Sequence, residues 1–121
     1  MKNNVAFISG HLSLTRKEFI DHYKDKIDDA IEQECSFVVG DSKGADYMAQ
    51  QYLKDKTPFV TVYHMFKSPR NNVGYETKGG FKSDIGRDTM MTLDSNFDIA
   101  WVRPGRENSG TAMNLKRRGE V

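Results

Sequence analysis

The segment FVVGDSKGAD at residues 37–46 contains the sequence pattern that best predicts the fold. It opens with a short apolar run, which is typical of a strand buried on both faces in a parallel sheet. A polar turn with two glycines follows, and apolar residues then recur at helical spacing, which predicts a helix over about 44–55. A strand that passes through a short turn into a helix is the repeating unit of an α/β fold.

The same alternation of strands and helices continues on both sides of this segment. Before it, Val5–Ile8 is another short apolar run, and Thr15 and Glu18 have the spacing of a capping box at the start of a helix. Apolar residues at helical spacing continue that helix to Ile31. After it, Phe59–Tyr63 predicts a third strand. This order of elements predicts right-handed crossovers and a parallel sheet.

The C-terminal half contains a long loop, two helices and a fourth strand. Residues 64–83 lack periodicity and include one proline and three glycines, so they predict a loop that serves as a ligand lid or a partner surface. A helix is predicted over 83–93, a strand over 99–102 and a last helix over about 111–118. The first of these helices has three apolar candidates for its inward face: Ile85, Met90 and Leu93.

Together these elements predict one α/β domain over residues 1–121, a compact Rossmann-like three-layer sandwich with a mainly parallel sheet. The four strands are expected in the order 3-2-1-4. The order then reverses between the first and fourth strands, which is where open α/β sheets bind their ligands. So few strands leave apolar surface uncovered, and we expect a homodimer or a larger homo-oligomer, with subunits that complete each other's pockets.

Composition excludes several other classes of protein. Lys and Arg number 18 against 17 Asp and Glu, and a net charge of +1 disfavours a protein that binds long nucleic acid by counterion release. Cys35 is the single cysteine, and the three histidines lack ligand spacing, so neither a metal site nor a cofactor is expected. No apolar run reaches the roughly 20 residues that span a bilayer. We therefore expect a cytoplasmic protein without a membrane partner.

Three polar turns should meet at one edge of the sheet: residues 9–11, 40–46 and 103–111. Each follows a strand, and the carboxyl ends of parallel strands share an edge. Their glycines, hydroxyls and helix N-termini are the components of an anion site, although no Walker A or dinucleotide fingerprint is present. Arg87 or Arg103 could supply a countercharge. The predicted ligand-binding residues are Ser9, Gly10, His11, Gly40, Asp41, Ser42, Lys43, Gly44, Asp46, Arg87, Arg103, Ser109, Gly110, Thr111 and Asn114.

Each of these residues also has a purely structural interpretation. Glycines 40 and 44 permit a tight turn between a strand and a helix. Asp41 and Ser42 are suitable helix caps. His11 can be a solvated loop residue and Arg103 a surface charge. The functional interpretation depends on the convergence of the three turns and not on any one residue.

All three turns resemble segments of known families. ISGH at 8–11 and GDSKGAD at 40–46 resemble the SLOG superfamily of Rossmann-like nucleotide-ligand proteins. Gly40, Gly44, Ala45 and Asp46 match that superfamily's second motif, whereas the two residues after Gly40 depart from it. DIAWVRPGRENSGTAMNL at 98–115 resembles the related nucleoside 2-deoxyribosyltransferases and nucleotide N-glycosidases, in which a strand leads to Ser-Gly-Thr-Ala and a helix. The resemblance covers nearly the whole chain apart from 64–83, and it implies a nucleotide-type pocket.

One departure from the deoxyribosyltransferase pattern bears on catalysis. In those enzymes a glutamate two residues beyond Ser-Gly-Thr-Ala is the nucleophile, and this chain has Asn114 there. A neutral amide is a poor nucleophile, so whether the protein is an enzyme stays open. Asp46, Asp84 and Asp88 are weak candidates for a relocated acid. Asp84 also suits the first turn of a helix, and Asp88 a solvated face.

Three functions follow from these patterns. The first is a protein that binds a nucleotide, a nucleoside or a nucleotide-derived signal, and senses or sequesters it. The second is an N-glycosidase or deoxyribosyltransferase-like enzyme that acts on a nucleotide through a relocated acid or a positioned water. The third is an oligomeric partner-binding module with a vestigial pocket.

Overall fold

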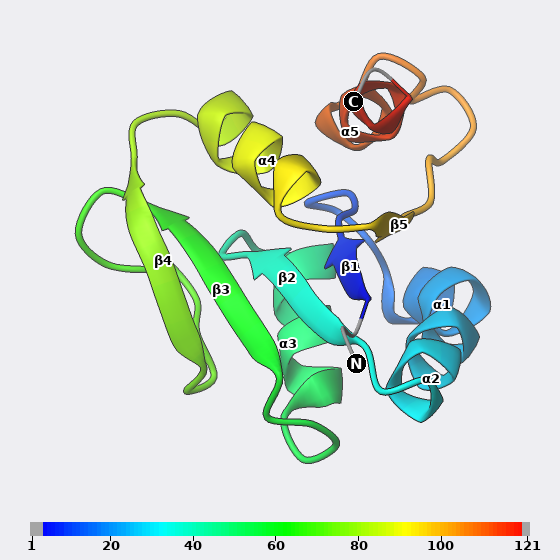
Figure 1. Cartoon of the computed structure of the whole chain (residues 1–121). Coiled ribbons are helices and arrows are strands. Elements are labelled where there is room, and N and C mark those ends of the chain that lie inside the picture. The colour runs from blue at the N-terminus through cyan, green and yellow to red at the C-terminus, as the bar shows by residue number, and fades with distance from the viewer. Residues whose placement is uncertain (1–3, 120–121) are drawn as a thin grey trace.

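A five-stranded sheet forms the centre of the structure, a computed structural model that describes residues 4–119 (Figure 1). Its order is β4-β3-β2-β1-β5, and all four pairings are parallel. This confirms the α/β class and the parallel sheet. The strands are β1 (Val5–Ile8), β2 (Ser36–Gly40), β3 (Val60–Met65), β4 (Glu76–Phe81) and β5 (Phe97–Ile99).

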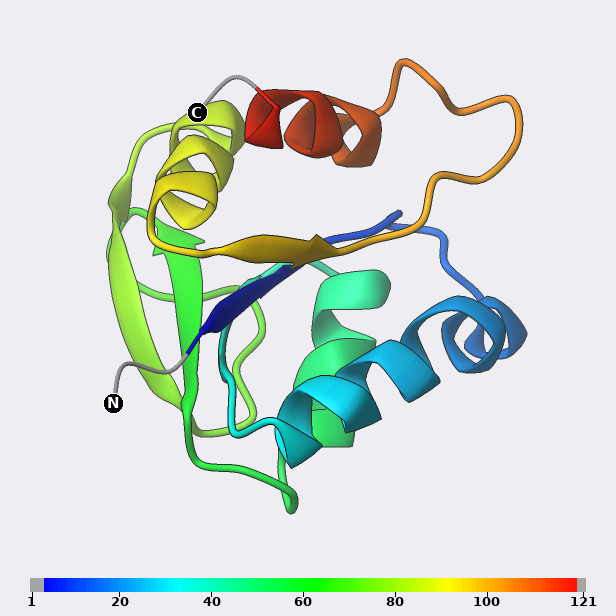
Figure 2. The same cartoon turned by 45° about the vertical axis from the view of Figure 1, so that its right-hand side comes forward.

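Helices cover both faces of the sheet and complete a Rossmann-like three-layer sandwich. α1, η1, α2 and α3 lie on one face, and α4 and α5 lie on the other (Figure 2). Thr15 forms the expected capping box with Glu18, and Ser83 caps α4. Within the described part of the chain, no helix has both the length and the apolar character to cross a bilayer. The helices are α1 (Arg16–Phe19), the π-helical turn η1 (Ile20–Lys24), α2 (Asp25–Glu32), α3 (Ala45–Leu53), α4 (Asp84–Leu93) and α5 (Gly110–Arg118).

Strand β4 corrects the prediction of a loop over residues 64–83. Residues 76–81 pair with β3 at the edge of the sheet, and only 66–75 form an irregular connection. The strand has no apolar pattern because all of its residues except Phe81 are exposed, and its pairing depends on backbone hydrogen bonds. The expected order 3-2-1-4 is otherwise present, since the predicted fourth strand is β5, which begins at Phe97.

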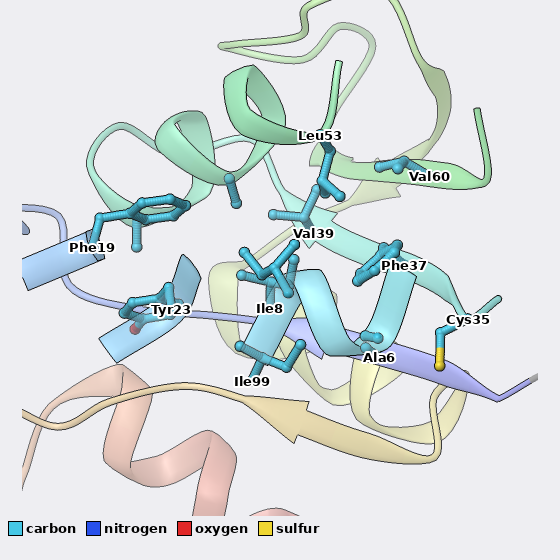
Figure 3. Packing of buried hydrophobic residues seen from close by; sticks show 14 of the residues in the cluster. Ala6, Ile8, Phe19, Tyr23, Cys35, Phe37, Val39, Leu53, Val60 and Ile99 are labelled. Atoms are coloured by element: carbon cyan, nitrogen blue, oxygen red, sulfur yellow. The ribbon is translucent and has the colours of Figure 1, made fainter. Parts of the chain in front are cut away.

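The core lies mainly between the sheet and the helices α1 to α3 (Figure 3). Ile8 and Val39 point to this face, where they pack with Tyr23 and Leu53. Phe7 and Val38, which come directly before these two residues in sequence, point to the other face, because successive side chains of a strand point to opposite faces. That second cluster is smaller and contains Phe7, Val38, Tyr63 and Met91. The two clusters fix the strands and thereby the loops at their carboxyl ends.

Candidate functional site

A pocket of about 260 Å³ lies at the carboxyl edge of the sheet, and we call it the carboxyl-edge pocket. Its lining comes from β1, the turns after β1 and β2, helix α4 and the start of α5. A larger and more open hollow of about 940 Å³ lies at the amino edge and is lined by none of the predicted site residues. The predicted residues that line the carboxyl-edge pocket are Ser9, Gly10, His11, Ser42, Asp46, Asp84, Arg87, Asp88, Ser109, Gly110, Thr111 and Asn114.

Five predicted ligand-binding residues do not line this pocket, and the two glycines among them shape its walls. Gly44 has φ +74°, and a Cβ atom there would lie 2.5 Å from the carbonyl oxygen of His11. A Cβ on Gly40 would lie 2.5 Å from Oδ2 of Asp46, so this glycine makes room for the buried carboxylate. Lys43 is exposed. The other two residues, Asp41 and Arg103, act through their partners.

Arg103 directs its charge away from the pocket. Its guanidinium donates to Glu18 at 2.7 and 2.9 Å and to Oγ of Ser13 at 3.0 Å. These hydrogen bonds hold the pKa of Glu18 at about 2. The Arg103 backbone N–H donates to Nε2 of His11 at 2.9 Å, so that nitrogen carries no proton. Burial and the charges of Arg103 and Arg106 lower the pKa of His11, which is therefore a neutral wall residue that joins two loops.

Arg87 is the centre of a buried charge cluster behind the pocket. Its Nη1 donates to Oδ1 of Asp41 at 2.7 Å, and its Nε and Nη2 donate to Oδ1 of Asp88 at 3.1 Å. Asp41 is 1% exposed in its side chain and also binds Arg70, from the 66–75 connection, through three hydrogen bonds. The cluster ties β2, the connection and α4 together at the carboxyl edge.

Asp46 adds a buried carboxyl group to this cluster. Its Oδ2 accepts the Ser42 backbone N–H at 3.2 Å. Burial raises its pKa from the ordinary 3.8 to about 7, and the charges of Asp88 and Asp41 add to the rise, whereas Arg87 opposes it. Burial also raises the pKa of Asp88. This end of the pocket therefore holds carboxyl groups that keep protons to higher pH than usual.

The raised pKa of Asp46 predicts that the contribution of this residue to the free energy of unfolding falls as pH rises. Between pH 4 and 7 the folded state retains a proton that the unfolded state releases, so the free energy of unfolding falls over this window and is flat above it. The loss is at most about 4 kcal/mol, at about 1.4 kcal/mol for each pH unit. We expect Asp46→Asn to reduce this slope, of which Asp88 retains a part, and to be the more stable protein at pH 8.

Urea unfolding at a series of pH values measures this effect. Asp55→Asn, which changes an exposed carboxylate, is the matched control and should keep the slope of the parent protein. Parallel profiles for the parent protein and Asp46→Asn would show that Asp46 does not hold the proton.

The opposite end of the pocket presents hydrogen-bond donors. Ser109 caps α5 by accepting the Ala112 N–H, and the N–H groups of Gly110 and Thr111 belong to the first turn, where a helix leaves them without internal partners. Among the described residues, Oγ of Ser9 is buried in the wall without a hydrogen-bond partner. Arg106 adds a positive charge. The lining therefore combines hydrogen-bond donors at the start of α5 with carboxyl groups that Arg70 and Arg87 partly neutralise.

Asn114 is bound to the acidic end and is not free in the pocket. Its Nδ2 donates to Oδ2 of Asp88 at 3.3 Å, and its Oδ1 accepts from Nη1 of Arg117 at 2.6 Å. At the position where the resemblance implies a glutamate, Asn114 thus binds the carboxyl group of Asp88. Of the three acid candidates, Asp46 and Asp88 are largely buried, and Asp84 is 59% exposed in its side chain at the rim.

Several lining residues escape prediction from the sequence. Phe7, Leu12 and Met91 are apolar residues that the patterns assign to core or surface. Arg70 lies in a segment without periodicity, and the sequence around Arg106 does not distinguish it from an exposed arginine. Within residues 4–119, no cluster of three or more His, Cys, Asp or Glu side chains is arranged to hold a metal ion. Comparison with family models, curated proteins and solved structures found no match.

Proposed function

We propose that this protein binds a nucleotide, a nucleoside or a nucleotide-derived signal in the carboxyl-edge pocket and senses or sequesters it. The observation that carries the proposal is the mixed lining of the pocket, with N–H donors at the start of α5, the cation of Arg106, and carboxyl groups on α3 and α4. A nucleotide has matching ends, an anionic phosphate and a sugar or base with hydroxyl and amino donors. A pocket of about 260 Å³ is small for a ligand site and favours one nucleoside unit over two.

Each end of the pocket has a distinct role in this proposal. The N–H groups of Gly110 and Thr111, with Arg106, bind the anionic group at the positive end of the helix dipole. Asp84 and Asp88 accept hydrogen bonds from hydroxyl or amino groups. Arg87 neutralises the buried carboxylates that would otherwise repel a phosphate.

We expect Arg106→Ala to weaken binding of a nucleoside monophosphate by about 10- to 100-fold, the usual loss for a charged hydrogen bond. Binding of the matching nucleoside should change little, because it lacks the anion. Titration calorimetry against nucleosides, nucleotides and cyclic nucleotides measures both. Lys82→Ala, which removes an exposed cation outside the pocket, is the control. A folded protein that binds no compound of this panel would contradict the proposal.

The second candidate function is cleavage or transfer of an N-glycosidic bond, and the position of Asp88 favours it. This side chain lies in the pocket against Asn114, and burial raises its pKa, as a general acid that protonates a leaving base requires. Chromatography would detect base release from nucleotides. Turnover that is lost in Asp88→Asn while binding remains would support the enzyme, and tight binding without turnover would support the binding protein.

The homodimer or larger assembly stays a prediction. Large apolar side chains are exposed at the carboxyl edge, where Phe66 is 64% and Ile85 is 72% exposed. A second copy that covered them would lie beside the carboxyl-edge pocket. Light scattering at micromolar concentration tests this prediction, and a monomer there would contradict it.

A further inference from the structure

A second hollow, of about 520 Å³, lies between the helices α1 and η1 on one side and α3 on the other, and we call it the helix groove. It is on the face of the sheet opposite α4 and α5, and it shares no lining residue with the carboxyl-edge pocket. Its chemistry is also different, because the groove has an apolar floor and a basic rim. The proposed nucleotide site does not explain it.

The floor of the groove is built from fixed aromatic residues and an exposed isoleucine. The ring of Tyr52 packs edge-on against Phe19 at 5.7 Å between centroids, and its hydroxyl donates to Asp28. Ile20 begins the π-helical turn and follows Phe19, so its side chain lies outside the inward row of Phe19 and Tyr23. Ile20 is 52% exposed and contributes apolar surface that the core does not use.

The rim carries three cations, of which one is paired with a carboxylate. Arg16 is the first residue of the helical segment 16–32, where a positive charge opposes the helix dipole. Nζ of Lys56 lies 4.0 Å from the centre of the Tyr52 ring. Among residues 4–119, neither of these two side chains forms an ion pair, and only the third rim cation, Lys24, pairs with Asp28, at 3.2 Å.

We propose that the helix groove binds an acidic amphipathic helix of another protein. A groove between helices with an apolar floor suits a helix that lays its apolar face into it. Glutamates or aspartates beside that face would meet Arg16, Lys24 and Lys56. A second copy of this chain is a poor occupant, because a groove-to-groove contact about a two-fold axis would bring these same cations together.

Three labelled synthetic peptides of about four helical turns test this proposal in a fluorescence anisotropy titration at low salt. One has leucines at helical spacing and glutamates elsewhere, the second replaces the glutamates by lysines, and the third replaces the leucines by serines. We expect the Leu/Glu peptide to bind at least about tenfold more tightly than either of the others. Ile20→Ser should weaken it by about tenfold, the usual effect of a lost apolar contact.

A charge reversal gives the sharpest discrimination. Arg16→Glu/Lys56→Glu should reverse the preference, so that the Leu/Lys peptide binds more tightly, whereas Lys67→Glu/Lys82→Glu should leave it unchanged because both lysines are exposed outside the groove. Thermal melting confirms that each variant is folded. Equal affinity for the three peptides, absence of binding, or an unchanged preference after reversal would overturn the proposal. A dimer in light scattering that Ile20→Glu dissociates would assign the groove to a second copy instead.

Discussion

Replacing Arg87 by Met is expected to lower the free energy of unfolding by about 3–5 kcal/mol at neutral pH. The guanidinium is 5% exposed and neutralises Asp41, Asp88 and, through space, Asp46. Methionine fills much of the same volume, so the loss comes mainly from buried carboxylates that lose a countercharge: Asp88 loses its ion pair, and Asp41 keeps only Arg70. Removal of one partner from a buried ion pair costs far more than the pair contributes as a whole.

Urea unfolding at neutral and acidic pH measures this effect. The loss should shrink as pH falls, because protonation of Asp46 and Asp88 removes the uncompensated charge. Lys82→Met changes an exposed cation and should move the free energy of unfolding by less than about 0.5 kcal/mol. A loss for Arg87→Met within that control range would show that the cluster is not held by this arginine.

Replacing Gly44 by Ala is expected to destabilise the protein by roughly 2–6 kcal/mol. Its φ of +74° is strained for any residue with a Cβ, which costs about 1–3 kcal/mol. The new Cβ would also meet the carbonyl oxygens of His11 and Leu12, and overpacking of this kind costs about 1–3 kcal/mol. Both oxygens belong to the backbone, so neither can move without moving the pocket wall.

Gly105→Ala separates the two contributions to this loss. Gly105 has φ +88°, but a Cβ there meets no atom within 4 Å. It should therefore show the strain alone and lose less than Gly44→Ala. Thermal or urea unfolding measures both variants, and equal losses would mean that the close approach of the turn to His11 contributes nothing.

The strands that carry apolar runs are predictable from the sequence, and the edge strand is not. Residues 5–8 and 37–39 belong to strands that are covered on both faces, so their uninterrupted apolar runs predict these strands. Strand β4 pairs through its backbone, and its exposed side chains follow no pattern. Helix α4 shows the same limit, because Ile85 and Leu93, expected to face inward, are 72% and 58% exposed. The helix buries Arg87, Met91 and Thr92, and Arg87 pairs with Asp41 and Asp88, a contact that an apolar period does not detect.

The position of the candidate site is predictable for a topological reason. Carboxyl ends of parallel strands share an edge, so the turns at 9–11, 40–46 and 103–111 had to meet there. The roles of single charges depend on partners that are distant in sequence. Arg103 is directed to Glu18, and Arg70, in the connection that follows β3, is directed to Asp41. No local sequence pattern predicts either contact.

The most direct test of the account is an NMR titration of the ¹⁵N-labelled protein with a panel of nucleosides and nucleotides. We expect at least one nucleotide to shift the amide signals of Gly110 and Thr111 at the start of α5, together with those of Ser9 and Gly10 after β1. The amides around the helix groove should not shift. Unchanged spectra across the panel, or shifts confined to residues outside the carboxyl-edge pocket, would contradict the proposal that this pocket binds a nucleotide-type ligand.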